Sequence, residues 1–421
     1  MDAPTTLPEF WDEAADIVVV GLGAAGFATS VTANELGADV LILEKAPEGE
    51  EGGNTRVAGQ GYLNTSDPEN AEAYLTALCG PYKVPEVMIR TWAKEMCQNN
   101  NWLASVGADP QEHQHQPVGI EFPELPGSNC VHKFHDGPTY GYSLTWKRFE
   151  SLVKERPIRI LYETPGKELI QNGQTGEIVG VRAIRDGNTI SVKARKAVVL
   201  TCGGFENNQQ MIRDYLPDLP YCYTSGSPYN EGDGVSMALA VGADLWHMNN
   251  FAGPTMAFKA EGISTTFSMQ AFHFSKEMAG GAIAVGPDGK RFTDEKYKNR
   301  HGKVPLHGTW KKMPTPCPMH MIFDHAHMKA GPLWDATPRH GWTQIIEKYD
   351  WSKDNNAELD KGWIKSAGTV EGLAEIIGVD PTALLDTVKG WNEGCEAGTD
   401  PEFGRSMMLN PIAEAPYYAI E

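Results

Sequence analysis

One stretch near the N-terminus constrains what this chain can fold into. An apolar run at residues 17–20 leads directly into the glycine-rich sequence GLGAAG at residues 21–26. A helical pattern follows at residues 27–36, and a second apolar run occupies residues 40–43. Strand, glycine turn, helix and strand in this order predict the βαβ unit that binds a dinucleotide.

The three glycines have separate roles in such a unit. Gly21 permits a tight turn, Gly23 lets a diphosphate approach the backbone, and Gly26 lets the helix pack closely on the strand. The diphosphate is expected at the helix N-terminus, where unpaired N–H groups and the helix dipole favour negative charge. Glu44 follows Gly21 at about the 20-residue spacing expected of the acid that binds a ribose diol.

Composition and charge exclude several classes of partner. A length of 421 residues is typical of two or three domains. The formal net charge of −19 argues against nucleic acid, because phosphate binding needs clustered Lys and Arg. No apolar run approaches the roughly 20 residues of a membrane helix, and the acidic N-terminus lacks the features of a signal peptide. We therefore expect a cytoplasmic protein without a membrane span.

The residues that commonly bind metals show no useful spacing. The seven cysteines are scattered and never form a CxxC pair, so we expect free buried thiols. His113 and His115 form one close pair, and His325 and His327 another, but neither pair has further ligands at a suitable spacing. We therefore expect no metal. No GxSxG element supports serine hydrolase chemistry.

Hydrophobic periodicity predicts a series of helices after the βαβ unit. The longest, at residues 85–106, places Met88, Trp92, Met96 and Leu103 on its apolar face. Other helical patterns occupy residues 71–79, 144–155, 209–215, 232–241, 370–377 and 381–396. Residues 108–142 are rich in His, Pro and Gly and are expected to form an irregular surface excursion.

Strand patterns alternate with these helices. Residues 158–162 and 196–201 are expected to join the parallel sheet, and a meander is predicted from three runs at 167–171, 178–184 and 189–192. Short strands are expected later in the chain, at residues 282–285 and 319–323. From about residue 251, methionine, histidine, aromatic residues and proline become more frequent, which indicates an inserted second domain.

Three further motifs follow the βαβ unit in order: GGNTRVAGQG at residues 52–61, TCGGF at 201–205 and EGDGVSMALAVGADL at 231–245. With them the chain resembles the flavoproteins of the fumarate reductase and 3-ketosteroid dehydrogenase type, over nearly its whole length. The resemblance implies an α/β fold: a Rossmann-like FAD-binding domain with a β-meander, plus an inserted α+β cap domain. It also implies FAD as the cofactor.

The resemblance divides the chain into an FAD-binding part at residues 1–254, a cap at 255–406 and a return into the FAD-binding domain at 407–421. The family's cofactor contacts map onto Gly21, Gly23, Ala24, Ala25, Gly26, Glu44, Lys45, Gly53, Asn54, Thr55, Gly59, Gln60, Gly61, Thr201, Gly203 and Asp233. In the family, a segment similar to PYYAI at residues 416–420 precedes further flavin-binding motifs, and these motifs are expected to be missing here.

The expected catalytic residues lie in GKRFTDEKY at residues 289–297, which is similar to the family's GxRFxNE segment. The resemblance places Glu295 at the acid of that segment. Ketosteroid dehydrogenases have a proton-transferring tyrosine just after it, and Tyr297 is the nearest match. A phenol has a pKa near 10, so it needs help from its surroundings to act as a base near neutrality.

Two positions depart from the fumarate reductase pattern. Gly253 stands where that branch has a histidine, and Met328 stands where it has a catalytic arginine. A dicarboxylate needs cationic partners, so these differences argue against fumarate. Apolar residues in the expected cap suit a larger apolar substrate: Met256, Phe258, Phe267, Met269, Phe272 and Phe274.

The leading hypothesis is therefore an FAD-dependent oxidoreductase that acts on a carbon–carbon bond next to a carbonyl, on a 3-ketosteroid or another enone. Hydride would pass through the flavin N5, with Tyr297 moving the proton and an unidentified electron donor or acceptor completing the cycle. One alternative is a reductase of a small unsaturated carboxylate such as fumarate or urocanate, with Arg300 or Arg291 as acid or anion anchor. The other is a flavin-binding chain without turnover.

Overall fold

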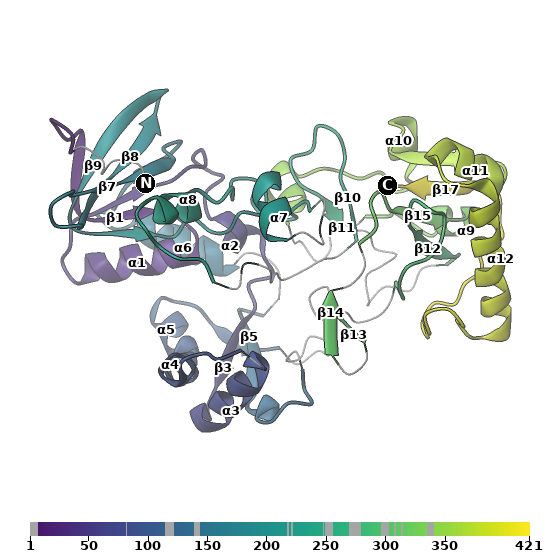
Figure 1. The fold of residues 1–421 in the computed structure, drawn as a ribbon, viewed down its shortest axis with the longest axis horizontal. Helices are drawn as coiled ribbons and strands as arrows, with labels where there is room; N and C mark the ends of the chain where they lie inside the picture. The colour runs from purple at the N-terminus through teal and green to yellow at the C-terminus, as the bar shows by residue number, and fades with distance from the viewer. Residues whose placement is uncertain are drawn as a thin grey trace. The chain divides into compact units, whose positions relative to one another are not determined.

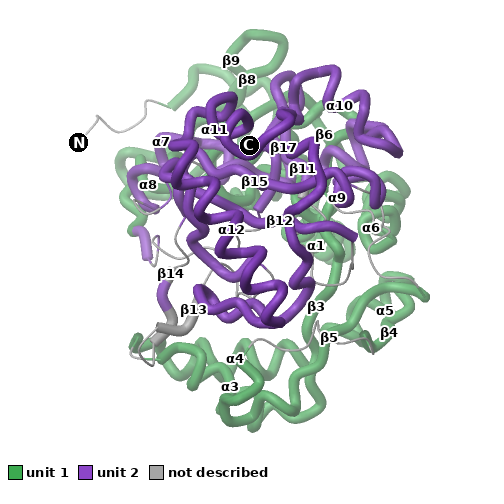
Figure 2. The backbone as a smooth tube through the Cα atoms, turned by 90° about the vertical axis from the view of Figure 1, so that its right-hand side faces the viewer, with its two compact units in different colours: residues 1–205, 229–244, 338–341 green, residues 206–228, 245–337, 342–421 purple. Residues whose placement is uncertain are grey.

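The computed structural model describes most of the chain, namely residues 7–80, 82–113, 122–138, 144–216, 219, 222–246, 248, 256–268, 279–295, 303–306, 309–312, 315–334 and 341–421. It divides into two compact units, drawn in different colours in Figure 2. Unit 1 comprises residues 1–205, 229–244 and 338–341, and unit 2 comprises residues 206–228, 245–337 and 342–421.

The core of unit 1 is a sheet of six strands in the order β6-β2-β1-β9-β8-β7. Strands β6 (Arg159–Leu161), β2 (Val40–Leu43), β1 (Glu13–Val20) and β9 (Asn188–Leu200) run parallel. Between β1 and β2 the chain forms α1 (Ala24–Glu35). The predicted βαβ unit is confirmed, and the four residues of β2 are all buried, as expected of a central parallel strand.

The predicted meander is present, with one difference in its last strand. Strands β7 (Gly166–Gln171) and β8 (Ile178–Arg185) pair antiparallel with each other, and β8 pairs antiparallel with β9. The two separate strands expected at residues 189–192 and 196–201 are one continuous strand, β9. This strand is long because its first half pairs with β8 and its second half with β1.

The two faces of this sheet are covered by different elements. On β1, Val18 and Val20 face a core shared with the meander and with Met237 of α8 (Asp233–Ala240). Val19 faces the opposite core, which is formed with α1 and α6 (Leu144–Lys154) (Figure 1). In that second core, Phe27 of α1 stacks on Phe149 of α6 with ring centroids 3.8 Å apart.

A smaller sheet in unit 1 contradicts the irregular excursion predicted for residues 108–142. Strands β3 (Tyr62–Thr65), β5 (Val131–Asp136) and β4 (Pro110–Glu112) form an antiparallel sheet, and a short 3-10 helix η1 (Ser128–Cys130) precedes β5. The prediction was wrong because strand pairing here joins segments distant in sequence. Residues 114–121 and 139–143 lie outside the described part.

The helix predicted at residues 85–106 is two helices, α4 (Glu86–Met96) and α5 (Asn99–Ser105), which follow α3 (Pro68–Cys79). Asparagine side chains explain the break, because they compete for backbone hydrogen bonds. Asn99 donates to the carbonyl of Leu63, and Asn64 accepts from the N–H of Asn100. Both contacts tie the start of α5 to β3.

The predicted apolar face of α4 was partly wrong. Met88 and Trp92 are 55% and 49% exposed, whereas Ile89, Ala93 and Met96 are buried against α3. The stripe at positions i, i+4 and i+7 starting from Ile89 thus faces the core, one residue further round the helix than expected.

Unit 2 contains an antiparallel sheet of four strands in the order β12-β15-β17-β16. Its strands are β12 (Ala282–Val285), β15 (His320–Phe323), β17 (Tyr417–Ile420) and β16 (Ile364–Ala367). Helices α11 (Val370–Ile377) and α12 (Pro381–Ala397) cover one face (Figure 1).

An aromatic cluster covers the other face of this sheet. Phe258 and Phe267 lie in the strand pair β10 (Ala257–Phe258) and β11 (Phe267–Ser268), and they pack with Trp334, Trp351 and Phe323. The remaining elements of unit 2 are β13 (Lys303–Leu306), β14 (Thr309–Lys312), α7 (Gln209–Tyr215), α9 (His325–Lys329), the π-helical turn η3 (Thr343–Glu347) and α10 (Asn356–Asp360).

The final segment pairs within unit 2. Residues 407–421 were expected to return to the FAD-binding domain, but β17 pairs with β15 and β16. The domain boundaries at residues 254 and 406 stay a prediction.

Candidate functional site

The ends of three neighbouring strands meet in unit 1. The N–H of Gly21, after β1, donates to the carbonyl of Leu43 in β2 at 2.8 Å. Thr201, after β9, donates from its N–H to the carbonyl of Val20 at 2.9 Å and from its hydroxyl to that of Gly21 at 2.7 Å. Ligands of parallel α/β sheets bind outside such carboxyl ends.

The glycines of the turn differ in what surrounds them. Gly21 has φ +102°, and a Cβ there would lie 2.6 Å from the carbonyl oxygen of Thr201. A Cβ on Gly26 would lie 2.1 Å from the oxygen of Gly21, so both positions require glycine for the fold itself. A Cβ on Gly23 would approach no protein atom closer than 3.7 Å. Unlike Gly21 and Gly26, Gly23 is therefore not required by the protein's own packing, as expected of a glycine that lets a ligand approach the backbone.

Helix α1 begins directly after Gly23. Its N-cap is Gly23, which makes no side-chain cap, and its first turn contains no acidic residue. The N–H of Ala24 donates to Thr55 Oγ1 at 3.1 Å, which leaves the hydroxyl proton of Thr55 to be donated elsewhere. Ala25 follows in the same turn. Such a helix start favours a phosphate group.

Glu44 lies at the end of β2 and is buried. One carboxylate oxygen accepts from the N–H of Leu22 at 2.7 Å and the other from the N–H of Ala46 at 2.8 Å. Burial raises the pKa of Glu44, and the hydrogen bonds from Ala46 and Leu22 oppose that rise. Each oxygen keeps a lone pair that can accept from a ribose hydroxyl.

Gln60 is bonded within the protein. Its amide N–H group donates to the carbonyl of Thr55 at 2.8 Å, and its amide oxygen accepts from the N–H groups of Thr145 and Trp146 at the start of α6. The side chain thus joins the short helix α2 (Gly53–Val57) to α6.

The other predicted glycines lie in turns around this site. Gly53 begins α2 and Asn54 follows it, while Gly59 and Gly61 flank Gln60 ahead of β3. Gly203 has φ +73°, and a Cβ there would lie 2.9 Å from Asn230 Oδ1. Backbone conformation alone accounts for glycine at position 203.

Lys45 and Asp233, both predicted to contact the cofactor, contact each other. Lys45 Nζ lies 2.7 Å from Asp233 Oδ2 and also pairs with Glu231, and Lys167 Nζ lies 2.7 Å from Asp233 Oδ1. The structure thus brings together the predicted residues after β1, β2 and β9, and it adds Lys167 and Glu231.

Glu295, predicted to be catalytic, is buried in unit 2. Its carboxylate accepts from the N–H of Ala284, from Nε and Nη2 of Arg291, and from Nη1 of Arg405, at 2.9–3.2 Å. A carboxylate has about four lone-pair sites, so Glu295 has none left for substrate. The structure assigns its side chain to holding unit 2 together and lends no support to a catalytic role.

The guanidinium groups of Arg291 and Arg405 are likewise hydrogen-bonded within the protein. Arg291 binds Asp400 through both of its terminal nitrogens, at 2.9 and 3.0 Å, and its side chain is 1% exposed. Arg405 also donates to the carbonyls of Ala282, Met407 and Met408. Both guanidinium groups also lie 4.7 Å from the centre of the Trp391 ring.

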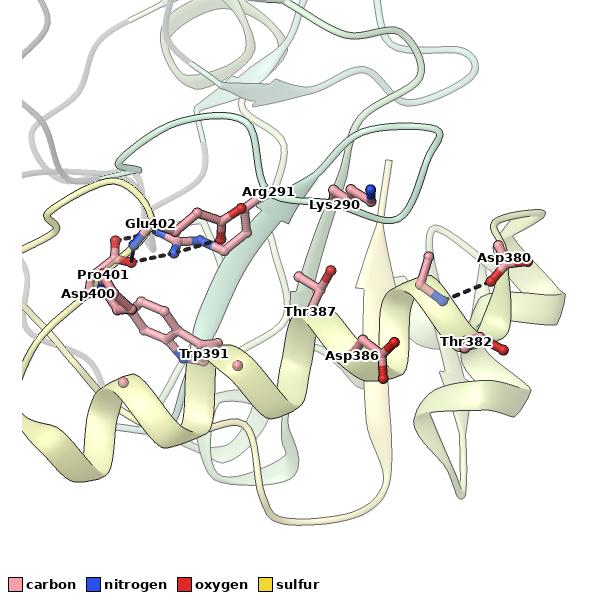
Figure 3. Close-up of a pocket in the computed structure, with 13 residues that line it drawn as sticks. Lys290, Arg291, Asp380, Thr382, Asp386, Thr387, Trp391, Asp400, Pro401 and Glu402 are labelled. Atoms are coloured by element: carbon pink, nitrogen blue, oxygen red, sulfur yellow. Dashed lines mark hydrogen bonds and ion pairs between the residues drawn. The ribbon is translucent and has the colours of Figure 1, made fainter.

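A groove of about 530 Å³ runs along α12 beside this network (Figure 3). Its walls include Thr387 and Trp391 of α12, with Lys290 and Glu402 opposite them. Arg291 is the one residue of the groove that was proposed from sequence for a function.

Several predicted residues cannot be placed. Tyr297, Arg300, Gly253, Met269, Phe272 and Phe274 lie outside the described residues. Met328, at the position of the family's arginine, is buried among Phe323, Trp334 and their neighbours. Met256, Phe258 and Phe267 also pack in that cluster, so their side chains form core.

Two further findings concern metals and membranes. In the part of the chain that the structure describes, no three His, Cys, Asp or Glu residues gather as a metal site. Helices within those same ranges are too short or too polar to cross a bilayer.

Cys202, beside the site, donates to the carbonyl of Val20, and burial raises the pKa of its thiol to about 11, which makes it unreactive.

Sequence reasoning missed Lys167, Glu231, Asp400 and Arg405. Each acts through a partner distant in the chain, as Lys167 does through Asp233 and Arg405 through Glu295. No local motif marks such pairs.

Comparison with known proteins gives a family and several relatives. The family model described as FAD binding domain matches residues 16–421. Digoxin reductase from Eggerthella lenta is 30% identical over 97% of this chain and 75% of its own length. NADH:fumarate oxidoreductase from Klebsiella pneumoniae is 27% identical over 96% of this chain and 40% of its own length. Urocanate reductase from Eggerthella lenta is 26% identical over 98% of this chain. The chain thus spans 75% of the length of digoxin reductase, 40% of NADH:fumarate oxidoreductase and 64% of urocanate reductase.

Solved structures share the fold. A 3-ketosteroid Δ1-dehydrogenase from Sterolibacterium denitrificans matches with a TM-score of 0.68 at 20% identity, covering 97% of this chain and 87% of that one. A flavocytochrome c3 fumarate reductase in its open conformation matches with a TM-score of 0.64 at 23% identity, and the match covers 97% of this chain and 66% of that one. The expected Rossmann-like fold with a cap is therefore confirmed as the fold class.

The site described in unit 1 fits FAD. Gly23 lets a diphosphate approach the backbone without a steric clash, and the start of α1 has no acidic residue to oppose its charge. Buried Glu44 presents oxygens for a ribose. With the match over residues 16–421, the chain belongs to the FAD binding domain family, as the resemblance to fumarate reductases and 3-ketosteroid dehydrogenases implied, and its cofactor is FAD.

Proposed function

We propose that this protein is an FAD-dependent oxidoreductase acting on a carbon–carbon bond next to a carbonyl, with a steroid-like enone as the substrate class. One observation carries the choice of substrate. Arg291 and Arg405 are saturated by Glu295, Asp400 and backbone carbonyls, so neither can hold a substrate carboxylate.

The lack of a positive charge at position 328 supports the same choice of substrate. Met328 stands where fumarate reductases have an arginine, and it is buried among aromatic side chains. A carboxylate left without a cationic partner in such surroundings would be costly, whereas an uncharged enone would not. The relative named digoxin reductase, whose name gives no small carboxylate as substrate, supports this proposal.

Each residue then has a defined task. Backbone N–H groups at Gly23 and Ala25 and the hydroxyl of Thr55 hold the cofactor diphosphate, and Glu44 accepts from the adenosine ribose. When bound, FAD supplies two-electron transfer to or from the β-carbon. Tyr297 moves the proton at the α-carbon. Glu295, two residues earlier, accepts from the N–H of Ala284 and so keeps the segment before Tyr297 packed against β12.

A second candidate is reduction of a small unsaturated carboxylate. Relatives named urocanate reductase and NADH:fumarate oxidoreductase favour it. In this case Arg300 would be the acid or anion anchor, because Arg291 is not available.

Substrate assays distinguish the two candidates. Purified protein reconstituted with FAD should be yellow and should turn over 3-ketosteroids in a dye-coupled assay, with little activity on fumarate, urocanate or acrylate. Reconstituted protein that reduces the acids and ignores steroids would contradict our proposal and favour the second candidate. Yellow protein inactive on every compound would indicate a flavin-binding chain without turnover.

The variant Tyr297→Phe tests the proton transfer. Loss of a general acid or base lowers turnover by roughly 10² to 10⁴. We expect that loss in kcat, with the flavin absorption spectrum unchanged. Tyr82→Phe, at a tyrosine that is 59% exposed, is the control and should behave as the parent protein. Normal turnover of Tyr297→Phe would rule out the assignment.

The variant Glu295→Gln separates the structural role from the catalytic one. Breaking a buried ion pair on one side costs about 3–5 kcal/mol, so the free energy of unfolding of unit 2 should fall by that order. Glu402→Gln, whose carboxylate is 52% exposed and 3.7 Å from Arg291, should change it little. Urea denaturation followed by circular dichroism measures both. Unchanged stability with lost turnover would show instead that Glu295 is catalytic.

The variant Gly23→Val tests the diphosphate position. Gly23 has an ordinary extended backbone conformation, and a Cβ there would make only ordinary contacts at 3.7 and 3.8 Å, so the apoprotein should fold as before with the side chain in the space where the diphosphate is expected. The added side chain should occupy that space and weaken FAD binding by at least about tenfold, or 1.4 kcal/mol. Gly368→Val is the control: Gly368 follows β16 in unit 2, and a Cβ there meets nothing within 4 Å. Equal FAD affinity of the two variants, measured by fluorescence titration, would place the diphosphate elsewhere.

A further inference from the structure

Lys167 reaches the cofactor site although no motif of the chain contains it. Strand β7 begins at Gly166, where a Cβ would lie 2.8 Å from Val20 Cγ1. Val20 is the last residue of β1, so the meander brings residue 167 over the carboxyl ends of the parallel strands. There Lys167 Nζ lies 2.7 Å from Asp233 Oδ1.

The side chain of Lys167 completes a balanced group of four charges. Lys45 lies between Glu231 and Asp233, and Lys167 binds the second oxygen of Asp233. Two ammonium groups thus face two carboxylates. Lys45 alone could not balance both carboxylates, so without Lys167 the group would have a net charge of −1.

This group of charges adjoins the expected path of FAD. Lys45 follows Glu44, whose carboxylate accepts from the N–H of Leu22 inside the glycine turn. Asp233 is the first residue of α8, and the preceding Gly232 donates to the carbonyl of Gly204 after β9. The group of four charges therefore lies next to Glu44, where the ribose of the anionic cofactor is expected.

Partial burial strengthens the ion pairs. The side chains of Asp233 and Lys45 are 19% and 23% exposed, whereas Lys167 is 44% exposed. Burial alone would raise the pKa of Asp233, but hydrogen bonds from Lys167 and Lys45 lower it overall, so the carboxylate stays charged. Removal of Lys167 would leave that charge with Lys45 alone, which Glu231 already shares.

We infer that Lys167 is a positioning residue of the FAD site: by neutralising Asp233, it keeps the group of Lys45, Glu231, Asp233 and Lys167 free of net negative charge beside the anionic cofactor. This inference rests on the proposed function, since it assumes that the site holds FAD. Lys167 acts through Asp233 and touches neither substrate nor the reacting atoms.

The test is FAD affinity of the apoprotein as a function of salt. Lys167→Met should bind FAD about fivefold more weakly at low ionic strength, and most of this loss should disappear in about 0.5 M KCl, where charges are screened within roughly 4 Å. Lys167→Arg should retain the affinity of the parent protein. The double variant Lys167→Met with Glu231→Gln should regain it, because the remaining Lys45 and Asp233 are balanced.

The control is Lys193→Met. Lys193 lies in the half of β9 that pairs with β8, beside Trp11 at 6.0 Å, so it should leave FAD affinity unchanged at every salt concentration. Equal affinity of Lys167→Met and the parent would overturn the inference. A loss that neither salt nor Glu231→Gln reverses would also overturn it, because it would show a contact needed only for structure. A parent protein that binds no FAD would refute the proposed function itself.

Discussion

The left-handed backbone at Gly21 is the constraint on which the cofactor site depends. With φ +102° and the oxygen of Thr201 only 2.6 Å from where a Cβ would stand, the chain turns tightly enough for β1, β2 and β9 to end at one place. Hydrogen bonds to Leu43 and from Thr201 hold the three ends together. Every other part of the site, from Glu44 to the start of α1, takes its place from that junction.

Much of this architecture could be predicted from the sequence, because the glycine turn, the flanking apolar runs and the later motifs each act over a few neighbouring residues. The βαβ unit, the meander and α7, α11 and α12 lie where periodicity placed them. The prediction failed where pairing is between distant segments. The sheet of β3, β5 and β4 has no local signal. The chain also breaks between α4 and α5, where hydrophobic spacing alone would continue one helix and where Asn99 is instead bonded to Leu63.

The site, like the fold, was predicted where local motifs decide it and not where contacts between distant residues do. Glu44 and Thr201 stand where their motifs put them, since each directly follows a strand. A motif does not show whether a side chain is already occupied. Glu295 matches a catalytic pattern, yet four donors saturate it, and one of them, Arg405, lies more than a hundred residues further along. A bound carboxylate and a reactive one look alike in sequence.

The continuous strand β9 has a mechanical consequence. Its first residues belong to the meander and its last residues lead into Thr201, so the two halves of the sheet share one backbone. The segment next to the cofactor therefore cannot open by a local loop motion, because opening it would break the ladder with β1. The α2 segment around Thr55 is instead a short helix of five residues, so that side of the site is not held by a strand ladder.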